Sequence, residues 1–166
     1  MFNQVSKLWQ AIAVFSAVLS YSALALPEES AMSDLETPSH WSAEQRSVWA
    51  VVVEWNNAFA RNDGDAFFAY VHDDITLITP AHPYRVEGIR DDRAAYDFEL
   101  ASGESRVNFF QVMQPLVRVY GEMAVVTYFS RGYYGPDGGV IGYFKETDVL
   151  VKEDDQWKVI HIHLSN

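Results

Sequence analysis

The N-terminal half of the chain carries apolar residues at helical spacing. Between Val48 and Phe59 they recur every three or four positions, so one face of this segment is apolar. Ser42 precedes the segment and Gln45 lies three residues further on, which is the pattern of a capping box. We therefore expect a helix of about 18 residues. It should end at the polar break 62–64 and be followed by a short helix over 65–71.

The remainder of the chain is predicted to be mostly strand. Residues 74–79 alternate as a strand does, and a turn-rich loop over 81–88 leads to a polar helix over 89–101. From residue 106 onward, four β-rich segments follow one another with short turns between them. Pro115 lies inside the first of these segments, which indicates an edge strand or a bulge. The order predicts an α+β fold, with helices packed against one face of a curved, mostly antiparallel sheet.

The C-terminal residues 146–165 are predicted to form a β-hairpin around a polar turn at 152–155. Alternation along the last strand places on one face Trp157, Val159, His161 and His163, and on the other Ile160, Ile162 and Leu164. This strand is apolar on both faces, as is the segment 125–129. In a sheet with one face in water, apolar and polar residues should alternate more regularly along each strand. We therefore predict that another copy of the chain covers the outer face, in a homodimer or a larger homo-oligomer.

The first 25 residues are predicted to be a cleavable secretory signal. Lys7 precedes a mostly apolar stretch over 8–21, and small residues lead to a cleavage position after Ala25. The stretch is shorter than the roughly 20 residues that a bilayer span needs, so no membrane association is expected after cleavage. The polar residues 26–41 are expected to be a flexible leader, and residues 42–166 a single domain.

Cysteine content and charge narrow the classes of function. The chain has no cysteine, so an exported protein with this sequence, periplasmic or secreted, folds without disulfides. Its 23 acidic and 12 basic residues give a net charge of −11. Such a surface repels phosphate backbones, and no basic cluster compensates, so nucleic acid is not an expected partner.

Several ordered motifs resemble those of a known superfamily. Residues 86–88 read V-E-G, residues 114–122 resemble N-P-x-V-x-V-x-G-E, residues 146–149 resemble E-T-x-V, and residues 157–165 resemble W-x-x-V-H-x-H-x-S. Together they make the chain similar to the nuclear transport factor 2-like proteins, to their SnoaL-like members, and most of all to the association (hub) domain of calcium/calmodulin-dependent protein kinase II. The resemblance implies a cone-shaped domain with a pocket that associates through its sheet. It implies no kinase or calmodulin function.

Residues near the end of the chain are the main candidates for chemistry. His161 and His163 could share a metal ion, but spacing ties no third ligand to them, so no metal or other cofactor is expected. His161 could instead be a general base, with Asp73 as the other candidate, or both histidines could make structural hydrogen bonds.

Arg131 is a further candidate, because it falls on an arginine that the hub family also carries. Alternation with Val125 and Phe129 predicts that it points into the domain, where it would pair with Glu146 or with an anionic ligand. The predicted ligand pocket is lined by Trp55, Tyr70, Arg131, Glu146, His161 and His163.

Three hypotheses follow. The first is an exported association domain that self-assembles through its sheet and binds a small organic molecule, an anionic one if Arg131 contacts it. The second is a cofactor-free general acid/base enzyme of isomerase, dehydratase or cyclase type, with His161 or Asp73 as the base and Arg131 stabilising negative charge. The third is a structural hub with a filled core and no ligand.

Overall fold

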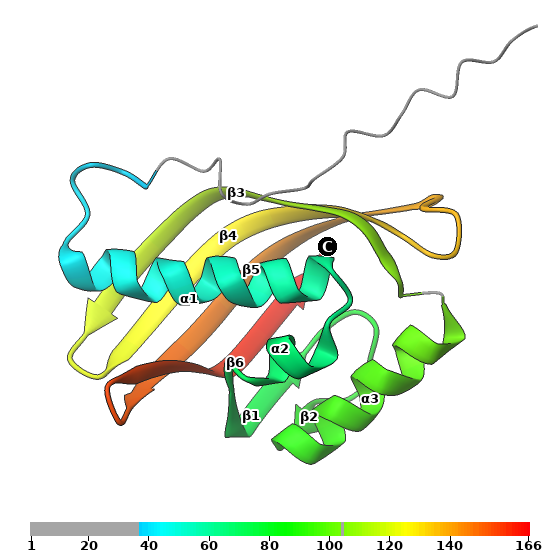
Figure 1. Ribbon diagram of the computed structural model, residues 1–166, viewed down its shortest axis with the longest axis horizontal. Helices are drawn as coiled ribbons and strands as arrows, with labels where there is room; N and C mark the ends of the chain where they lie inside the picture. Colours follow the sequence, from blue (N-terminus) through cyan, green and yellow to red (C-terminus); the bar gives the residue numbers. More distant parts are fainter. Residues whose placement is uncertain (1–36, 104) are drawn as a thin grey trace, which may run out of the picture.

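Three helices lie on one side of a six-stranded sheet (Figure 1). The computed structural model describes residues 37–103 and 105–166, so the predicted signal and most of the predicted leader lie outside the described residues. The helices are α1 (Ala43–Ala60), α2 (Gly64–Phe68) and α3 (Ile89–Ser102); the strands are β1 (Val71–Ile78), β2 (Val86–Glu87), β3 (Val107–Tyr120), β4 (Met123–Tyr134), β5 (Val140–Glu153) and β6 (Gln156–Ser165). The predicted α+β fold, with helices on one face of a curved sheet, is confirmed. Among the described residues, no helix has the length and apolarity needed to cross a membrane.

Helix α1 begins at the predicted capping box. The Ser42 hydroxyl accepts from the backbone N–H of Gln45 at 3.1 Å, and the Gln45 side chain accepts from the backbone N–H of Ser42 at 2.9 Å. Gln45 also donates to the Val117 carbonyl at 2.8 Å, which fixes the start of α1 to the sheet. Just before the helix, Trp41 is buried, and its ring packs edge-on against that of Trp49 with the ring centroids 6.1 Å apart.

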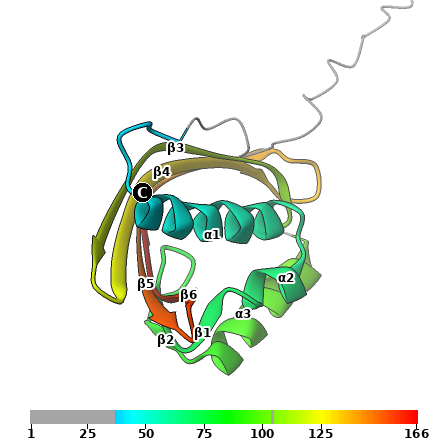
Figure 2. The same ribbon diagram turned by 60° about the vertical axis from the view of Figure 1, so that its left-hand side comes forward.

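The strands follow the order β2-β1-β6-β5-β4-β3, and only the β1–β6 pair is parallel. Strand β3 is therefore an edge strand. Its register with β4 shifts between Met113 and Leu116, and Gln114 has a positive φ of 53°. Both features predicted from Pro115, an edge position and a bulge, are confirmed. The sheet arches over α1, so the helices occupy its concave side (Figure 2).

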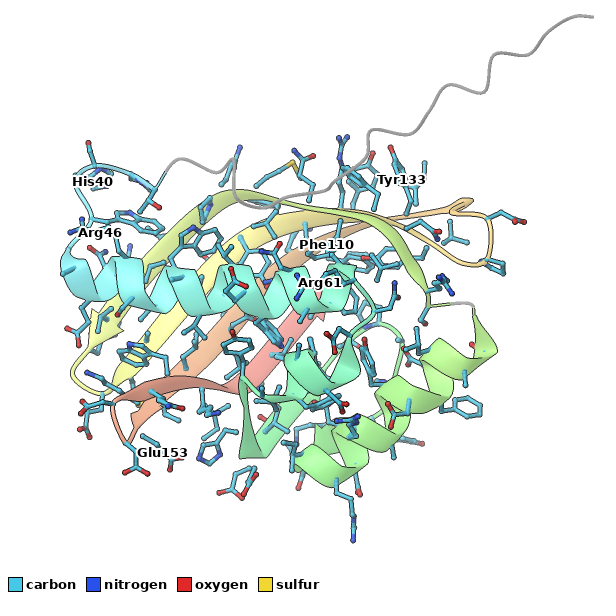
Figure 3. The ribbon with its side chains drawn as sticks, in the orientation of Figure 1. His40, Arg46, Arg61, Phe110, Tyr133 and Glu153 are labelled. Carbon is cyan, nitrogen blue, oxygen red and sulfur yellow. The ribbon has the colours of Figure 1, made fainter. Side chains whose placement is uncertain are left out.

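The two faces of the sheet differ in what they contact. On β4, Ala124, Val126 and Tyr128 are buried against the helices, whereas the intervening residues point away. Phe110 lies between α1 and the sheet, while Tyr133 points away from α1 on the opposite side (Figure 3). We call the face toward the helices the inner face and the opposite one the outer face.

A β-bulge changes the predicted faces of the last strand. Leu150 pairs with Val159 but its neighbour Val149 pairs with His161, which leaves Ile160 as an extra residue. Beyond the bulge the alternation is therefore inverted. The inner face of β6 carries Trp157, Val159, Ile162 and Leu164, and the outer face carries His161 and His163. The prediction that the histidines share a face with Trp157 is wrong for this reason.

Candidate functional site

The inner face of the sheet and the three helices line a cavity of about 470 Å³ that opens to the solvent. Its walls are mainly apolar, and exposed residues such as Val140 and Ile141 form part of its rim. The aromatic residues that line it are Trp55, Phe59, Phe67, Tyr96, Phe110, Tyr134 and Phe144. A cavity of this size, apolar and with a few polar groups, is the usual form of a small-molecule site.

Two glycines opposite each other on the sheet make room for part of the aromatic wall. Gly132 and Gly142 are register partners on β4 and β5. A Cβ atom on Gly142 would lie 2.5 Å from the Phe144 ring, and one on Gly132 would lie 2.5 Å from the Tyr134 hydroxyl. The two rings therefore cover backbone where any other residue would place a side chain.

Asp92 is the first buried acid of the cavity. It lies in the first turn of α3, is only 5% exposed, and its Oδ2 atom has no hydrogen-bond partner. Burial raises the pKa of Asp92 from 3.8 to about 6; His82 lowers it and Glu99 raises it by smaller amounts. Asp92 is therefore mostly ionised at neutral pH, with one oxygen unsatisfied inside an apolar wall.

Glu146 is the second buried acid, on the inner face of β5. The Ser130 hydroxyl donates to it, and burial raises its pKa toward neutrality despite hydrogen bonds from Ser130 and Tyr128. Asp148, two residues further along the same face, is fully buried, and burial together with the charge of Glu146 raises its pKa as well. Two carboxyls this close cannot both ionise in an apolar environment, so we expect the pair to retain a proton.

A third acid lies beside the loop that precedes β2. Glu99 of α3 is 3.2 Å from the Nε2 atom of His82, and the Ser105 hydroxyl donates to its other oxygen at 3.2 Å. Both His82 and Glu99 line the cavity. The pair supplies a polar edge to an otherwise apolar enclosure.

The structure brings only part of the predicted pocket together. Trp55 and Glu146 line the cavity, whereas Tyr70 is half-buried and is not among the lining residues. Arg131 is on the outer face, with its guanidinium 5.6 Å from the centre of the Phe109 ring and its Nε without a partner. The predicted inward orientation of Arg131, and with it a pairing with Glu146, is wrong, because the inward residues of β4 are its even-numbered neighbours.

The other predicted residues also lie away from the cavity. His161 shares a hydrogen bond of 2.7 Å with the Thr76 hydroxyl, and burial followed by the charges of His163 and Arg85 lowers its pKa. His163 is exposed on the same outer face, and Asp73 is exposed on β1. Within residues 37–103 and 105–166, no three His, Cys, Asp or Glu side chains are grouped so that they could hold a metal ion.

Asp92 was missed by reasoning from the sequence, although a signal was present. Residues 89–101 are predicted to form a polar helix, and the apolar residues on one side of that helix were not considered separately. Ile89, Asp92, Tyr96 and Glu99 follow one another at spacings of three and four, so Asp92 shares a helix face with apolar residues. An acid on an apolar stripe is a sign of a buried, functional carboxyl.

Comparisons with known proteins agree with this architecture. The model of the SnoaL-like domain matches residues 48–166. A nuclear transport factor 2-like protein of unknown function from Pseudomonas putida KT2440 superposes with a TM-score of 0.67 at 22% identity, over 74% of this chain and 86% of that one. The calcium/calmodulin-dependent protein kinase II hub of S. rosetta gives 0.62 at 25% identity, over 75% and 98%. A proposed ketosteroid isomerase from Parabacteroides distasonis gives 0.61 at 23% identity, over 78% and 92%. No curated protein matches the sequence.

Proposed function

The chain belongs to the SnoaL-like domain family, and we propose that it binds a small, largely apolar molecule in the cavity and transfers a proton to or from it without a cofactor. The observation that carries this proposal is the presence of two buried carboxyls, Asp92 and Glu146, in one apolar cavity. Buried acids with displaced pKa values concentrate at functional sites. The likeness to a proposed ketosteroid isomerase supports a catalytic reading of the same scaffold.

The two carboxyls have different surroundings and therefore different roles. Glu146 is held by Ser130, and its pKa is raised toward neutrality, the range in which a general acid or base works best at neutral pH. Asp92 lines the cavity, and its buried Oδ2 atom has no hydrogen-bond partner. We assign proton transfer to Glu146 and ligand orientation to Asp92. This replaces His161 and Asp73 as the candidate bases, because neither lines the cavity.

Ligand binding is tested by native mass spectrometry of protein purified from its own compartment. Ala95 lines the cavity on α3, and its neighbour Ala94 is exposed outside it, so Ala95→Trp fills the cavity while Ala94→Trp is the matched control. We expect the wild type and Ala94→Trp to retain the same small molecule and Ala95→Trp to lose it. A ligand that Ala95→Trp retains would place binding elsewhere.

Proton transfer is tested on the retained molecule in D₂O by NMR. The acidic C–H hydrogens of the retained molecule should exchange with solvent deuterium about 100-fold more slowly, or slower still, in Glu146→Gln than in the wild type. This is the usual contribution of a positioned acid or base. Glu153→Gln is the control, because Glu153 is exposed at the far end of the same strand. Equal exchange rates in the two variants would remove Glu146 from the chemistry and leave a binding protein.

A second function, self-association through the outer face, is favoured by the composition of that face. Among the outward positions of the described strands β3, β4 and β5 up to Val151, none is Asp or Glu, in a chain with 23 acids and 12 bases. Exposed large apolar residues on this face are Leu116, Tyr120, Met123, Phe129 and Tyr143. Apolar patches of this kind mark interaction surfaces. The likeness to a hub domain supports the same proposal.

Analytical ultracentrifugation tests the association. Phe129→Lys places a charge in the apolar patch, and Phe98→Lys does the same on α3, where Phe98 is 77% exposed and remote from the outer face. We expect the wild type and Phe98→Lys to be dimers or larger and Phe129→Lys to dissociate. A monomeric wild type at tens of micromolar would refute the proposal.

Export remains part of the proposed function and depends on the sequence of residues 1–25. Intact-mass analysis of the protein from its native host should give a chain that begins at Leu26. A full-length mass in the soluble cell extract would contradict it.

A further inference from the structure

The described side chains that line the cavity include acids but no Lys or Arg. Three carboxyls line it, those of Asp92, Glu99 and Glu146. No Lys or Arg is among its described lining residues, and the one imidazole, that of His82, is already paired with Glu99. The anionic ligand considered from the sequence depended on Arg131, which is on the outer face.

Asp92 is the acid whose charge is least compensated. The titratable groups that face it are His82 from the loop before β2 and Glu99 from its own helix, and these two pair with each other. Its Oδ2 atom has no hydrogen-bond partner. A buried charge without a partner is costly, so a ligand that supplies the missing positive charge gains more here than a neutral one.

The walls around Asp92 suit the same kind of ligand. Seven aromatic side chains line the cavity, and the faces of aromatic rings attract cations. The indole Nε1 of Trp55, another residue that lines the cavity, is also buried without a hydrogen-bond partner. The net charge of −11 favours the approach of cations from solution.

We propose that the cavity is selective for organic cations: protonated amines with an apolar body, whose ammonium group contacts Asp92. The inference rests on the proposed binding function of the cavity and adds the charge of the ligand. The division of roles is consistent with it, since an ammonium held by Asp92 leaves Glu146 available for proton transfer.

The test compares three probes of one shape: 2-(2-naphthyl)ethylamine, 2-(2-naphthyl)ethanol and 2-naphthylacetate. Affinity is measured with the mature protein by displacement of the neutral dye Nile red and by calorimetry. We expect the affinity of the amine to exceed that of the alcohol by a factor of about ten or more, which is the contribution of a charge-assisted hydrogen bond. The carboxylate should bind most weakly. Amine affinity should rise between about pH 5 and pH 8 as Asp92 ionises.

Two variants in the first turn of α3 test whether Asp92 itself, rather than any acid nearby, causes the preference for the amine. Asp92→Asn should abolish the preference for the amine, whereas Asp91→Asn, which removes an exposed neighbouring acid, should keep it. If the wild type binds the alcohol as tightly as the amine, the cation proposal is wrong although the cavity still binds ligands. If neither probe displaces the dye and Ala95→Trp does not alter dye binding, both the cation proposal and the proposed function fail. If Asp92→Asn does not fold, the preference of the wild type for the amine over the alcohol and the carboxylate still tests the inference.

Discussion

Replacing Asp92 by asparagine should stabilise the protein at neutral pH. Burial raises the pKa of this carboxyl from 3.8 to about 6, so between these pH values the folded state binds more protons than the unfolded state. The favourable contribution of protonated Asp92 is therefore complete below about pH 4 and is lost as the pH rises through about 6. Two pKa units correspond to about 3 kcal/mol of destabilisation at neutral pH. An asparagine cannot ionise and avoids this cost.

Urea unfolding at about pH 4.5 and about pH 7.5 measures the effect. At about pH 4.5 the unfolded chain is already mostly ionised at this position, and about 1 kcal/mol of the penalty is present. The stability of Asp92→Asn relative to wild type should therefore rise by about 2 kcal/mol between the two pH values. Asp91→Asn removes an acid from the same first turn of α3, and so controls for the loss of a favourable interaction with the helix dipole.

The comparison between the two variants can refute the reasoning. If Asp92→Asn and Asp91→Asn respond to pH in parallel, Asp92 does not titrate in an apolar environment. If Asp92→Asn is destabilised at about pH 7.5, the carboxylate makes contacts that outweigh its desolvation. Either result would also remove the basis for an unsatisfied charge in the cavity.

Three further substitutions test packing and local structure, each by urea unfolding at neutral pH. Leu150→Ala removes a fully buried side chain and should cost about 3–5 kcal/mol; a loss below about 1 kcal/mol would mean that the core there can collapse around the gap. Ser42→Ala breaks the capping box with Gln45 and should cost about 1 kcal/mol, with no loss expected if water replaces the hydroxyl fully. Gly142→Ala forces the Phe144 ring to move and should cost about 1–3 kcal/mol while reducing dye binding in the cavity; unchanged binding would show that the ring does not shape it.

The fold was predictable because its signals are local and repeated. The capping box at Ser42 and the apolar spacing that follows specify α1, and the proline in β3 marks the edge strand and its bulge. The motifs of residues 114–122 and 157–165 added the superfamily and hence the arrangement of helices on the sheet. The pairing of strands that are far apart in the sequence cannot be predicted from the residues of either strand alone. The parallel pairing of β1 with β6, for example, required the structure.

The candidate site was harder to predict, because single residues decide which face a side chain occupies. One extra residue at Ile160 inverts the alternation, and this moved His161 and His163 from the predicted pocket to the outer face. Arg131 was assigned inward because Val125 and Phe129 are apolar, yet apolar residues also occupy a face that we propose another copy covers. Hydrophobicity therefore did not distinguish the inner face of the sheet from the outer face.

The buried carboxyls were informative for the opposite reason. They are acidic residues at positions where the hydrophobic pattern calls for apolar ones, and such exceptions indicate a functional site. An acid on the apolar stripe of α3, and two acids on consecutive inward positions of β5, each lower the stability of the fold through desolvation. Among the described residues, none forms an ion pair with these three carboxyls: His82 pairs with Glu99 rather than with Asp92, and Glu146 and Asp148 disfavour ionisation of each other. A structural hub with a filled core would have no use for an unsatisfied carboxyl beside an apolar cavity. A protein that binds a cation and moves a proton would, which is why the Asp92 titration distinguishes the two.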